Sequence, residues 1–220
     1  MEKKTLLIYC AGGFGKELLQ LALEINEKQS RWRRICFVDD YTRNKMVCNT
    51  KIYTFDHIIK EMDNNECEFT IASGEPSLRN ELFKKIKRHN YYLTTLIHPN
   101  VVVPADLSIG EGAIISLGAV ITANVEIGKG ACVYYNTLIH HDVRIGDFCF
   151  IAGNSIICGN VNIGKQSFIG AMSVIRDEIS IGDNCIIGMG SVVLKNIESN
   201  SVAFGNPARI RSENNKTRVF

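Results

Sequence analysis

Residues 109–146 read IGEGAIISLGAVITANVEIGKGACVYYNTLIHHDVRIG, and this stretch decides the fold of the second half of the chain. An isoleucine or a valine recurs at every sixth residue from Val103 to Val193, sixteen positions in succession. A period of six matches neither the 3.6 residues of a helical turn nor the two-residue alternation of a flat strand. The period therefore indicates a repeating backbone unit, one side of a triangular solenoid.

Glycine recurs at three times this period and so sets the length of one coil. It follows the apolar residue every eighteen residues, at Gly110, Gly128, Gly146, Gly164 and Gly182. Two corners of each coil carry small residues, and the third accepts leucine, valine or isoleucine. With stacked strands about 4.8 Å apart, a little over five coils form a prism roughly 25 Å tall. The pattern predicts an uninterrupted left-handed parallel β-helix of hexapeptide repeats.

The first 95 residues or so have a different texture, in which apolar runs alternate with amphipathic segments. This alternation predicts a small Rossmann-like βαβ domain with helices on both faces of a sheet. We expect an N-terminal domain over residues 1–97 and the solenoid with its tail over residues 98–220. The expected strands are 5–9, 35–38, 68–72 and 93–97, and the expected helices are 16–26, 56–62 and 77–90.

A glycine-rich turn separates the first predicted strand from the first predicted helix. Gly12 and Gly13 permit a tight turn and a close approach of backbone amides to a phosphate at the helix N-terminus. A plain tight turn is the alternative, because Cys10 replaces the first glycine of the dinucleotide motif. Asp39 and Asp40 follow the second strand, where a carboxylate can meet a sugar hydroxyl or cap the next turn.

Composition limits the possible partners of the chain. Its 220 residues are 45% hydrophobic and its net charge is +2, which argues against a nucleic-acid or membrane surface. No two of the eight cysteines have a CxxC spacing, so we expect unpaired thiols in a reducing compartment and no metal. No signal peptide or membrane span is evident, and we expect a cytoplasmic protein.

The candidate catalytic residues are His140, His141 and Asp142. They interrupt a solenoid surface otherwise rich in Gly, Asn, Ser and Lys. A stacked repeat has no structural need for imidazole at one corner of one coil. A histidine with an ordinary pKa near 6.5 is suited to take a proton from an attacking amine, and a neighbouring carboxylate fixes its tautomer. Because successive extended residues point in opposite directions, only one of the two histidines can face a substrate.

Several segments together resemble the bacterial nucleotide-aminosugar N-acetyltransferases, a family that includes perosamine N-acetyltransferases and sialic acid O-acetyltransferases. The similar segments are AGGFGKE (11–17), FVDD (37–40), IHPN (97–100), HDVRIGDF (141–148), IGDNCIIGMGSVV (181–193) and GNPAR (205–209). The resemblance covers the whole chain and is not specific for one sugar or one nucleotide.

The resemblance implies a role for particular residues of this chain. It makes His141 the general base and Asp142 its orienting partner, with the Gly159 amide as donor to the thioester oxygen. It places acetyl-CoA, with no metal, along Gly159, Gly170, Ala171, Gly188, Met189, Pro207 and Arg209. It places the nucleotide-linked amino sugar near Gly12, Gly13, Asp39, Asp40, Ser73, Arg79, Tyr134, Asn136 and His140. It also implies a homotrimer with acetyl-CoA between neighbouring subunits.

Two departures from the family pattern fall near the acceptor or thioester site. Many relatives have asparagine where this chain has Tyr134, although Asn136 is close, and some have a second histidine where it has Phe150. The resemblance favours N-acetylation of a 4-amino-4,6-dideoxy sugar for surface polysaccharide, with O-acetylation of a sialic acid as the second interpretation.

Other classes of protein fit the sequence less well. A zinc carbonic anhydrase on the same solenoid needs three convergent histidines, and a sugar nucleotidyltransferase needs a catalytic domain larger than the first 95 residues. A non-catalytic scaffold, the third alternative, would show a flat repetitive face without a His–Asp interruption.

Overall fold

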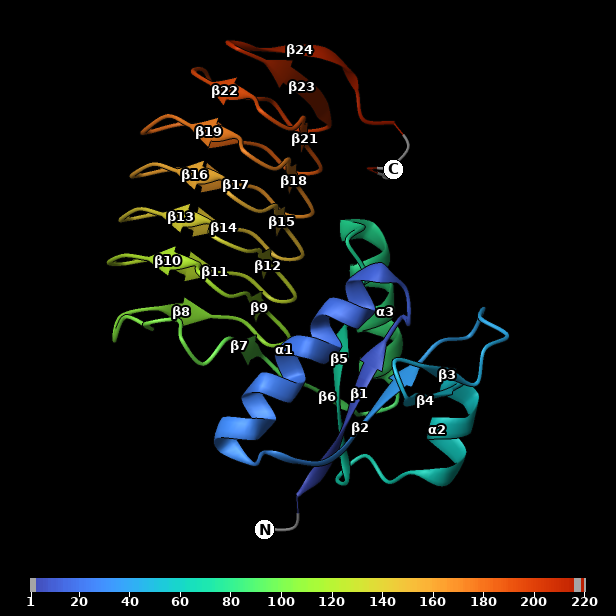
Figure 1. Cartoon of the computed structure of the whole chain (residues 1–220). Helices are drawn as coiled ribbons and strands as arrows, with labels where there is room; N and C mark the ends of the chain where they lie inside the picture. The colour runs from blue at the N-terminus through green and yellow to red at the C-terminus, as the bar shows by residue number, and fades with distance from the viewer. Residues whose placement is uncertain (1–2, 216–218, 220) are drawn as a thin grey trace.

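A computed structural model describes residues 3–215 and 219 of the chain and shows an α/β domain packed against the side of a triangular solenoid (Figure 1). The α/β domain has a sheet in the order β3-β4-β2-β1-β5-β6, parallel except for the β3–β4 pair. Its elements are β1 (Lys4–Tyr9), α1 (Gly13–Gln29), β2 (Trp32–Val38), β3 (Met46–Val47), β4 (Thr50–Tyr53), α2 (Phe55–Glu61), β5 (Cys67–Ile71), α3 (Pro76–Arg88) and β6 (Tyr92–Leu93).

Alternation along β1 explains the layers of this domain. Leu6 and Ile8 pack with α1 on one face of the sheet, while Leu7 and Tyr9 pack with residues of α2 and α3 on the other. The predicted βαβ order is confirmed, and β3 and β4 form an additional hairpin that the sequence pattern does not predict. Within residues 3–215, no helix has the length and apolarity needed to cross a bilayer.

Three sheets form the sides of the solenoid, as the six-residue period predicts, and their strands are short and parallel except for a longer antiparallel hairpin at the C-terminal end. The aliphatic face consists of β10 (Val120–Ile121), β13 (Leu138–Ile139), β16 (Ile156–Ile157), β19 (Val174–Ile175) and β22 (Val192–Val193). The polar face consists of β8 (Ser108–Ile109), β11 (Glu126–Ile127), β14 (Arg144–Ile145), β17 (Asn162–Ile163) and β20 (Ser180–Ile181).

The covered face is the third side, and α1 lies against it (Figure 1). It consists of β7 (Leu96–Ile97), β9 (Ile114–Ile115), β12 (Cys132–Val133), β15 (Phe150–Ile151), β18 (Phe168–Ile169), β21 (Ile186–Ile187), β23 (Ser201–Gly205) and β24 (Ala208–Glu213). Strand β7 pairs with β9, so the first coil begins at Leu96, and the boundary after residue 97 stays a prediction.

The second residue of each short strand points inward, and these residues stack into a core of isoleucine and valine. The small corner residues are favoured for a second reason besides their size. Where such a residue is serine or threonine, its hydroxyl donates a hydrogen bond to a backbone carbonyl. Ser155 Oγ, for example, donates to the carbonyls of Ala152 at 2.8 Å and Gly170 at 3.1 Å. A larger side chain there would displace a coil, and an apolar one would leave buried carbonyls with fewer donors.

Candidate active site

The three sheets meet at three corners, and the two histidines lie where the aliphatic face turns into the polar face. This His141 corner comprises residues 122–124, 140–142, 158–160 and 176–178 of successive coils. Its last position needs a left-handed backbone, since Asp142 has φ 59° and Asn160, one coil above, also has φ 59°. Aspartate and asparagine tolerate this conformation better than most residues, so the turn itself admits a carboxylate beside His141.

His141 and Asp142 form a hydrogen-bonded pair at this corner. Nδ1 of His141 lies 2.8 Å from Oδ2 of Asp142, and Asn124, one coil below, donates to Oδ1 of Asp142 at 2.6 Å. Hydrogen bonds from Asn124 and His141 lower the pKa of Asp142, so its carboxylate stays ionised over a wider pH range. With a proton on Nδ1, Nε2 of His141 carries the free lone pair.

Gly159 lies directly above the imidazole and leaves room for it. A Cβ built on Gly159 would come within 2.7 Å of Cε1 and 2.8 Å of Nε2 of His141, so only glycine permits this stacking. Residues at the same place in neighbouring coils are Ala123 and Asp177. The amide of Gly159 donates to Oδ1 of Asp177 at 3.2 Å.

We expect Gly159→Ala to lower kcat/KM by about tenfold to a hundredfold, because the new methyl group would push the imidazole ring out of position. The melting temperature should change little, since the imidazole is at the surface and can swing outward. The melting temperature and the circular dichroism spectrum of the same variant are the control for folding, because a loss confined to the imidazole leaves both at their wild-type values. A fully active Gly159→Ala enzyme would show that catalysis does not depend on the close approach of Gly159 to the imidazole.

We expect Asn124→Ala to raise the pKa of Asp142 towards its ordinary value, because Asn124 makes the largest contribution to lowering it. The carboxylate would then become protonated at a higher pH as the pH falls, and activity would begin to decline earlier on the acidic side. At neutral pH, kcat/KM should fall by about two- to fivefold. A pH profile and an NMR titration of Asp142 test this, with Asn160→Ala, at the same turn position, as the control.

A second group of predicted residues lies at another corner, where the covered face turns into the aliphatic face. This Met189 corner comprises residues 116–118, 134–136, 152–154, 170–172 and 188–190. The predicted sugar or acetyl-CoA contacts found there are Tyr134, Asn136, Gly170, Ala171, Gly188 and Met189. Met189 is 81% exposed and Met172, one coil below, is 69% exposed, so two unsupported apolar side chains stand on this corner.

Within one chain, therefore, the structure does not bring the predicted base and most predicted acetyl-CoA contacts together. The two corners flank opposite edges of the aliphatic face. Pro207 and Arg209 lie farther along the chain, in the exposed β23–β24 hairpin, which pairs with β21 at the end of the solenoid. His140 is half-buried beside His141, and its backbone amide donates to the carbonyl of Ile157.

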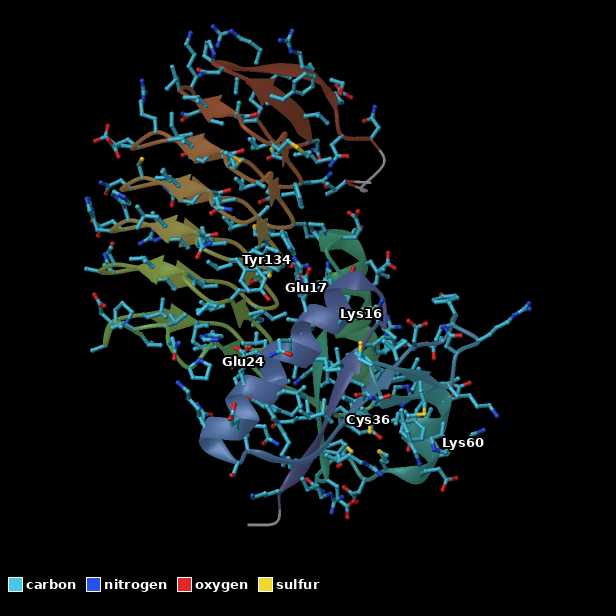
Figure 2. The ribbon with its side chains drawn as sticks, viewed as in Figure 1. Lys16, Glu17, Glu24, Cys36, Lys60 and Tyr134 are labelled. Carbon is cyan, nitrogen blue, oxygen red and sulfur yellow. The ribbon has the colours of Figure 1, made fainter. Side chains whose placement is uncertain are left out.

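Tyr134 faces the α/β domain, where it meets α1. Figure 2 shows Tyr134 on the solenoid with Glu17 of α1 close by. The ring of Phe14 packs edge-on against Tyr134 and Phe150, with both centroid distances 5.7 Å. The tyrosine and phenylalanine that depart from the family pattern thus form one aromatic cluster with the glycine-rich turn.

The glycine-rich turn is open to solvent at the two glycines that are predicted to approach a phosphate, and phosphate binding there stays a prediction. Gly12 and Gly13 are exposed, and a Cβ added to either would have no other atom within 4 Å. Gly12 precedes the first turn of α1 without a side-chain cap. Gly15 is required for packing, since a Cβ there would lie 2.3 Å from the Cys10 carbonyl oxygen. Free amides at a helix N-terminus favour an anion.

Asp39 and Asp40 are both engaged within the domain. Oδ1 of Asp39 accepts hydrogen bonds from the amides of Tyr41 and Thr42, both at 3.0 Å, which supports the turn-capping alternative. Burial raises the pKa of Asp40, but hydrogen bonds from Lys85 and Tyr9 outweigh this effect and lower it overall. These carboxylates order the edge of the sheet, and a role in binding sugar stays a prediction.

Arg79 does not have the role in substrate binding that the resemblance implies. Its side chain is 1% exposed, and its guanidinium donates to the carbonyls of Gly130 at 2.7 Å, Phe148 at 2.8 Å and Cys149 at 3.0 Å, as well as to Ser73. Four of the five guanidinium N–H groups are thus used within the chain and the side chain is buried, so Arg79 fastens α3 to the solenoid. Ser73 is buried as well, and its hydroxyl bonds with the backbone of Glu75.

Sequence reasoning missed Asn124, Phe14 and Met172. Asn124 had a usable signal, since it precedes Asp142 by eighteen residues and so lies one coil away in the same column. Phe14 and Met172 had no such signal. Their surroundings depend on how α1 packs against the solenoid and on which corner of the solenoid is exposed. In the part of the chain that the structure describes, no three His, Cys, Asp or Glu side chains gather as a metal site would require.

Comparisons with known proteins agree with this architecture. Residues 5–86 match the PglD N-terminal domain, and residues 95–206, slightly more than half of the chain, match the GMPPB C-terminal domain. A GDP-perosamine N-acetyltransferase of Escherichia coli O157:H7 is 31% identical over 110 residues, which are 50% of this chain and 49% of that protein. The chain thus aligns with about half the length of this curated relative.

Two solved structures extend the similarity to nearly the whole chain. The acetyltransferase domain of PglB from Neisseria gonorrhoeae, in complex with acetyl coenzyme A, is 25% identical with a TM-score of 0.88, over 96% of this chain and 100% of that one. PerB from Caulobacter crescentus, in complex with CoA and GDP-perosamine, is 25% identical with a TM-score of 0.86, over 94% and 97%. The chain belongs to the GMPPB C-terminal domain family and, with its PglD-type N-terminal domain, to the perosamine N-acetyltransferase-like hexapeptide acyltransferases.

Proposed function

We propose that this chain is an acetyl-CoA-dependent N-acetyltransferase that acts on the amine of a nucleotide-linked 4-amino-4,6-dideoxy sugar in surface polysaccharide synthesis. The observation that carries the proposal is the His141–Asp142 pair, held against a glycine that leaves Nε2 of the imidazole open. The relatives support it, since one is named for N-acetylation of GDP-perosamine and another binds acetyl coenzyme A.

His141 acts as the general base in this proposal. Nε2 accepts a proton from the sugar amine as the nitrogen forms its bond to the acetyl carbon, and Asp142 stabilises the resulting imidazolium. Acetyl-CoA supplies a thioester, whose carbon–sulfur bond breaks to release the thiolate. The proton on Nε2 can then pass to this sulfur, which leaves His141 neutral for the next turnover.

The Gly159 amide, one coil above His141, would be the donor to the thioester oxygen. A backbone N–H is fixed by its coil, so it can stabilise developing negative charge on the thioester oxygen without reorganising. The stacking of Gly159 on the imidazole supports this role, because donor and base are then separated by about one coil spacing.

A homotrimer would complete the site. The outward residues of the aliphatic face are Val120, Leu138, Ile156, Val174 and Val192, whereas those of the polar face are Ser108, Glu126, Arg144, Asn162 and Ser180. On the covered face, the outward residues Ile114, Cys132 and Phe150 are buried against the α/β domain. The aliphatic face has no such cover within the described residues, so we propose that two further copies cover it.

Three-fold symmetry about an axis facing the aliphatic face would bring the two halves of the site together. Each copy would place its His141 corner beside the Met189 corner of the next. Gly170 and Gly188 lie in successive coils beyond the level of His141, so the pantetheine arm would run along the solenoid axis in this groove. Met172 and Met189 would then have apolar partners.

The α/β domain would hold the nucleotide. The carboxyl ends of β1, β2 and β5 meet at one edge of the parallel sheet, the usual place for ligands in such folds. Gly12 and Gly13 lie at this edge beside Phe14, which contacts the Met189 corner. Phosphate at the α1 N-terminus would therefore orient the sugar towards the groove between subunits.

Thiol release from acetyl-CoA by the purified protein tests the proposal. The acceptors are dTDP-, UDP- and GDP-linked 4-amino sugars, with CMP-sialic acid as a hydroxyl acceptor. Rapid release with one amino sugar would support N-acetylation and identify the acceptor. Release with sialic acid alone would favour O-acetylation, and no release with any acceptor would argue for a non-catalytic solenoid.

A further inference from the structure

Asp177 accepts a hydrogen bond from the backbone amide that the proposed mechanism needs for the thioester oxygen. The Gly159 amide, assigned above to the thioester oxygen, donates to Oδ1 of Asp177 at 3.2 Å. Asp177 lies one coil above Gly159 and is exposed to solvent. The single N–H of Gly159 cannot donate fully to a carboxylate and a thioester oxygen at once, so one must leave before the other arrives.

Similar contacts elsewhere in the solenoid provide a comparison. Asp147 accepts from the Lys129 amide at 2.9 Å, and Asp183 accepts from the Lys165 amide at 2.7 Å, each one coil below the aspartate. Both lie at the third corner, between the polar and covered faces, and neither amide faces a histidine, so these contacts serve to link coils. The Asp177 contact is longer than either, and its donor lies beside the proposed base.

The side chain of Asp177 has room to move away. Its carboxylate is at the surface, and an exposed charged contact of this kind contributes little to stability. Displacing the Asp177 carboxylate from the Gly159 amide therefore costs little free energy. Only a ligand whose own oxygen takes its place has to meet this cost. Free CoA has no thioester oxygen and gains nothing from the Gly159 amide.

We propose that Asp177 sets the affinity for the acetyl thioester relative to free CoA, by occupying the Gly159 amide until the thioester oxygen takes its place. The inference rests on the proposed acetyl-transfer function. A site that is open for only part of the time binds its ligand with an affinity reduced by that fraction. Asp177 would thus weaken acetyl-CoA binding while leaving CoA binding unchanged, and so would reduce the advantage of substrate over product.

Calorimetric titration of the full chain with acetyl-CoA and with CoA tests the inference without any turnover. We expect Asp177→Ala to increase the ratio of the CoA Kd to the acetyl-CoA Kd by about two- to fivefold. Asp177→Asn, which keeps an acceptor but loses the charge, should give an intermediate ratio. Asp183→Ala removes an equivalent coil-to-coil contact far from His141 and should leave the ratio at the wild-type value.

A ratio unchanged in Asp177→Ala, with a melting temperature lowered as much as in Asp183→Ala, would show that Asp177 only links coils. A ratio that falls would show that the carboxylate assists acetyl-CoA binding, and would equally overturn the inference. If the wild-type protein binds acetyl-CoA but releases no thiol with any acceptor, the proposed function fails whatever Asp177 does. The two failures are therefore distinguishable.

Discussion

His141→Ala is expected to lower kcat by about 10²- to 10⁴-fold, the usual contribution of a general base. The substitution removes the lone pair at Nε2 that would take the proton of the amine. The Kd for acetyl-CoA should change little, because in the proposed site the imidazole would contact the reacting amine and would not contact the pantetheine arm. Steady-state kinetics with the acceptor found by thiol release measures the effect.

His140→Ala is the matched control, since it removes the neighbouring imidazole without disturbing the contact between His141 and Asp142. We expect it to retain a much larger part of the activity. Size-exclusion chromatography should give the same assembly for both variants, because neither side chain lies on the aliphatic face. A His141→Ala enzyme of near wild-type turnover would remove this residue from the role of base.

Ile156→Arg is expected to abolish both assembly and activity. Ile156 is the central outward residue of the aliphatic face, and the new charge would have to be buried without a partner between copies. Sedimentation velocity should show a monomer in place of a trimer, and thiol release should fall to the background rate. Activity would be lost because the proposed base and the predicted acetyl-CoA contacts lie on different corners, which the proposed trimer would bring together.

Asn162→Arg provides the corresponding control on the polar face, six residues along the chain. It introduces the same side chain into a strand of the same length at an exposed position, and we expect an unchanged trimer with full activity. If Ile156→Arg stays trimeric, the aliphatic face is not the subunit interface. If it becomes monomeric but remains active, the site is complete within one chain.

The solenoid could be predicted from sequence because each of its rules repeats. An inward Ile or Val every six residues and a glycine every eighteen follow from one coil geometry, and any single exception would have been visible. The hairpin of β3 and β4 could not be predicted in this way. It is short and partly exposed, so Met46 to Tyr53 carries little of the apolar alternation that marks a buried strand.

The site was less predictable than the fold. Its residues come together only because coils of the solenoid stack and because the α/β domain docks against the solenoid. The adjacent pair His141 and Asp142 is visible in the sequence, whereas Asn124 contacts Asp142 only because coils repeat at eighteen residues. The resemblance implied that Arg79 lies near the sugar. Its burial depends on the docking of α3 against the solenoid, which no local pattern reports.

Arg79 also has a consequence for the order in which the chain can mature during synthesis. Its carbonyl partners outside the α/β domain lie 51 to 70 residues downstream, so they leave the ribosome after α3. At about 5 to 20 residues per second, the guanidinium waits roughly 4 to 14 seconds for Cys149. Until then a nascent α/β domain keeps this cation hydrated, and the N-terminal half reaches its final packing only when the third solenoid coil is made.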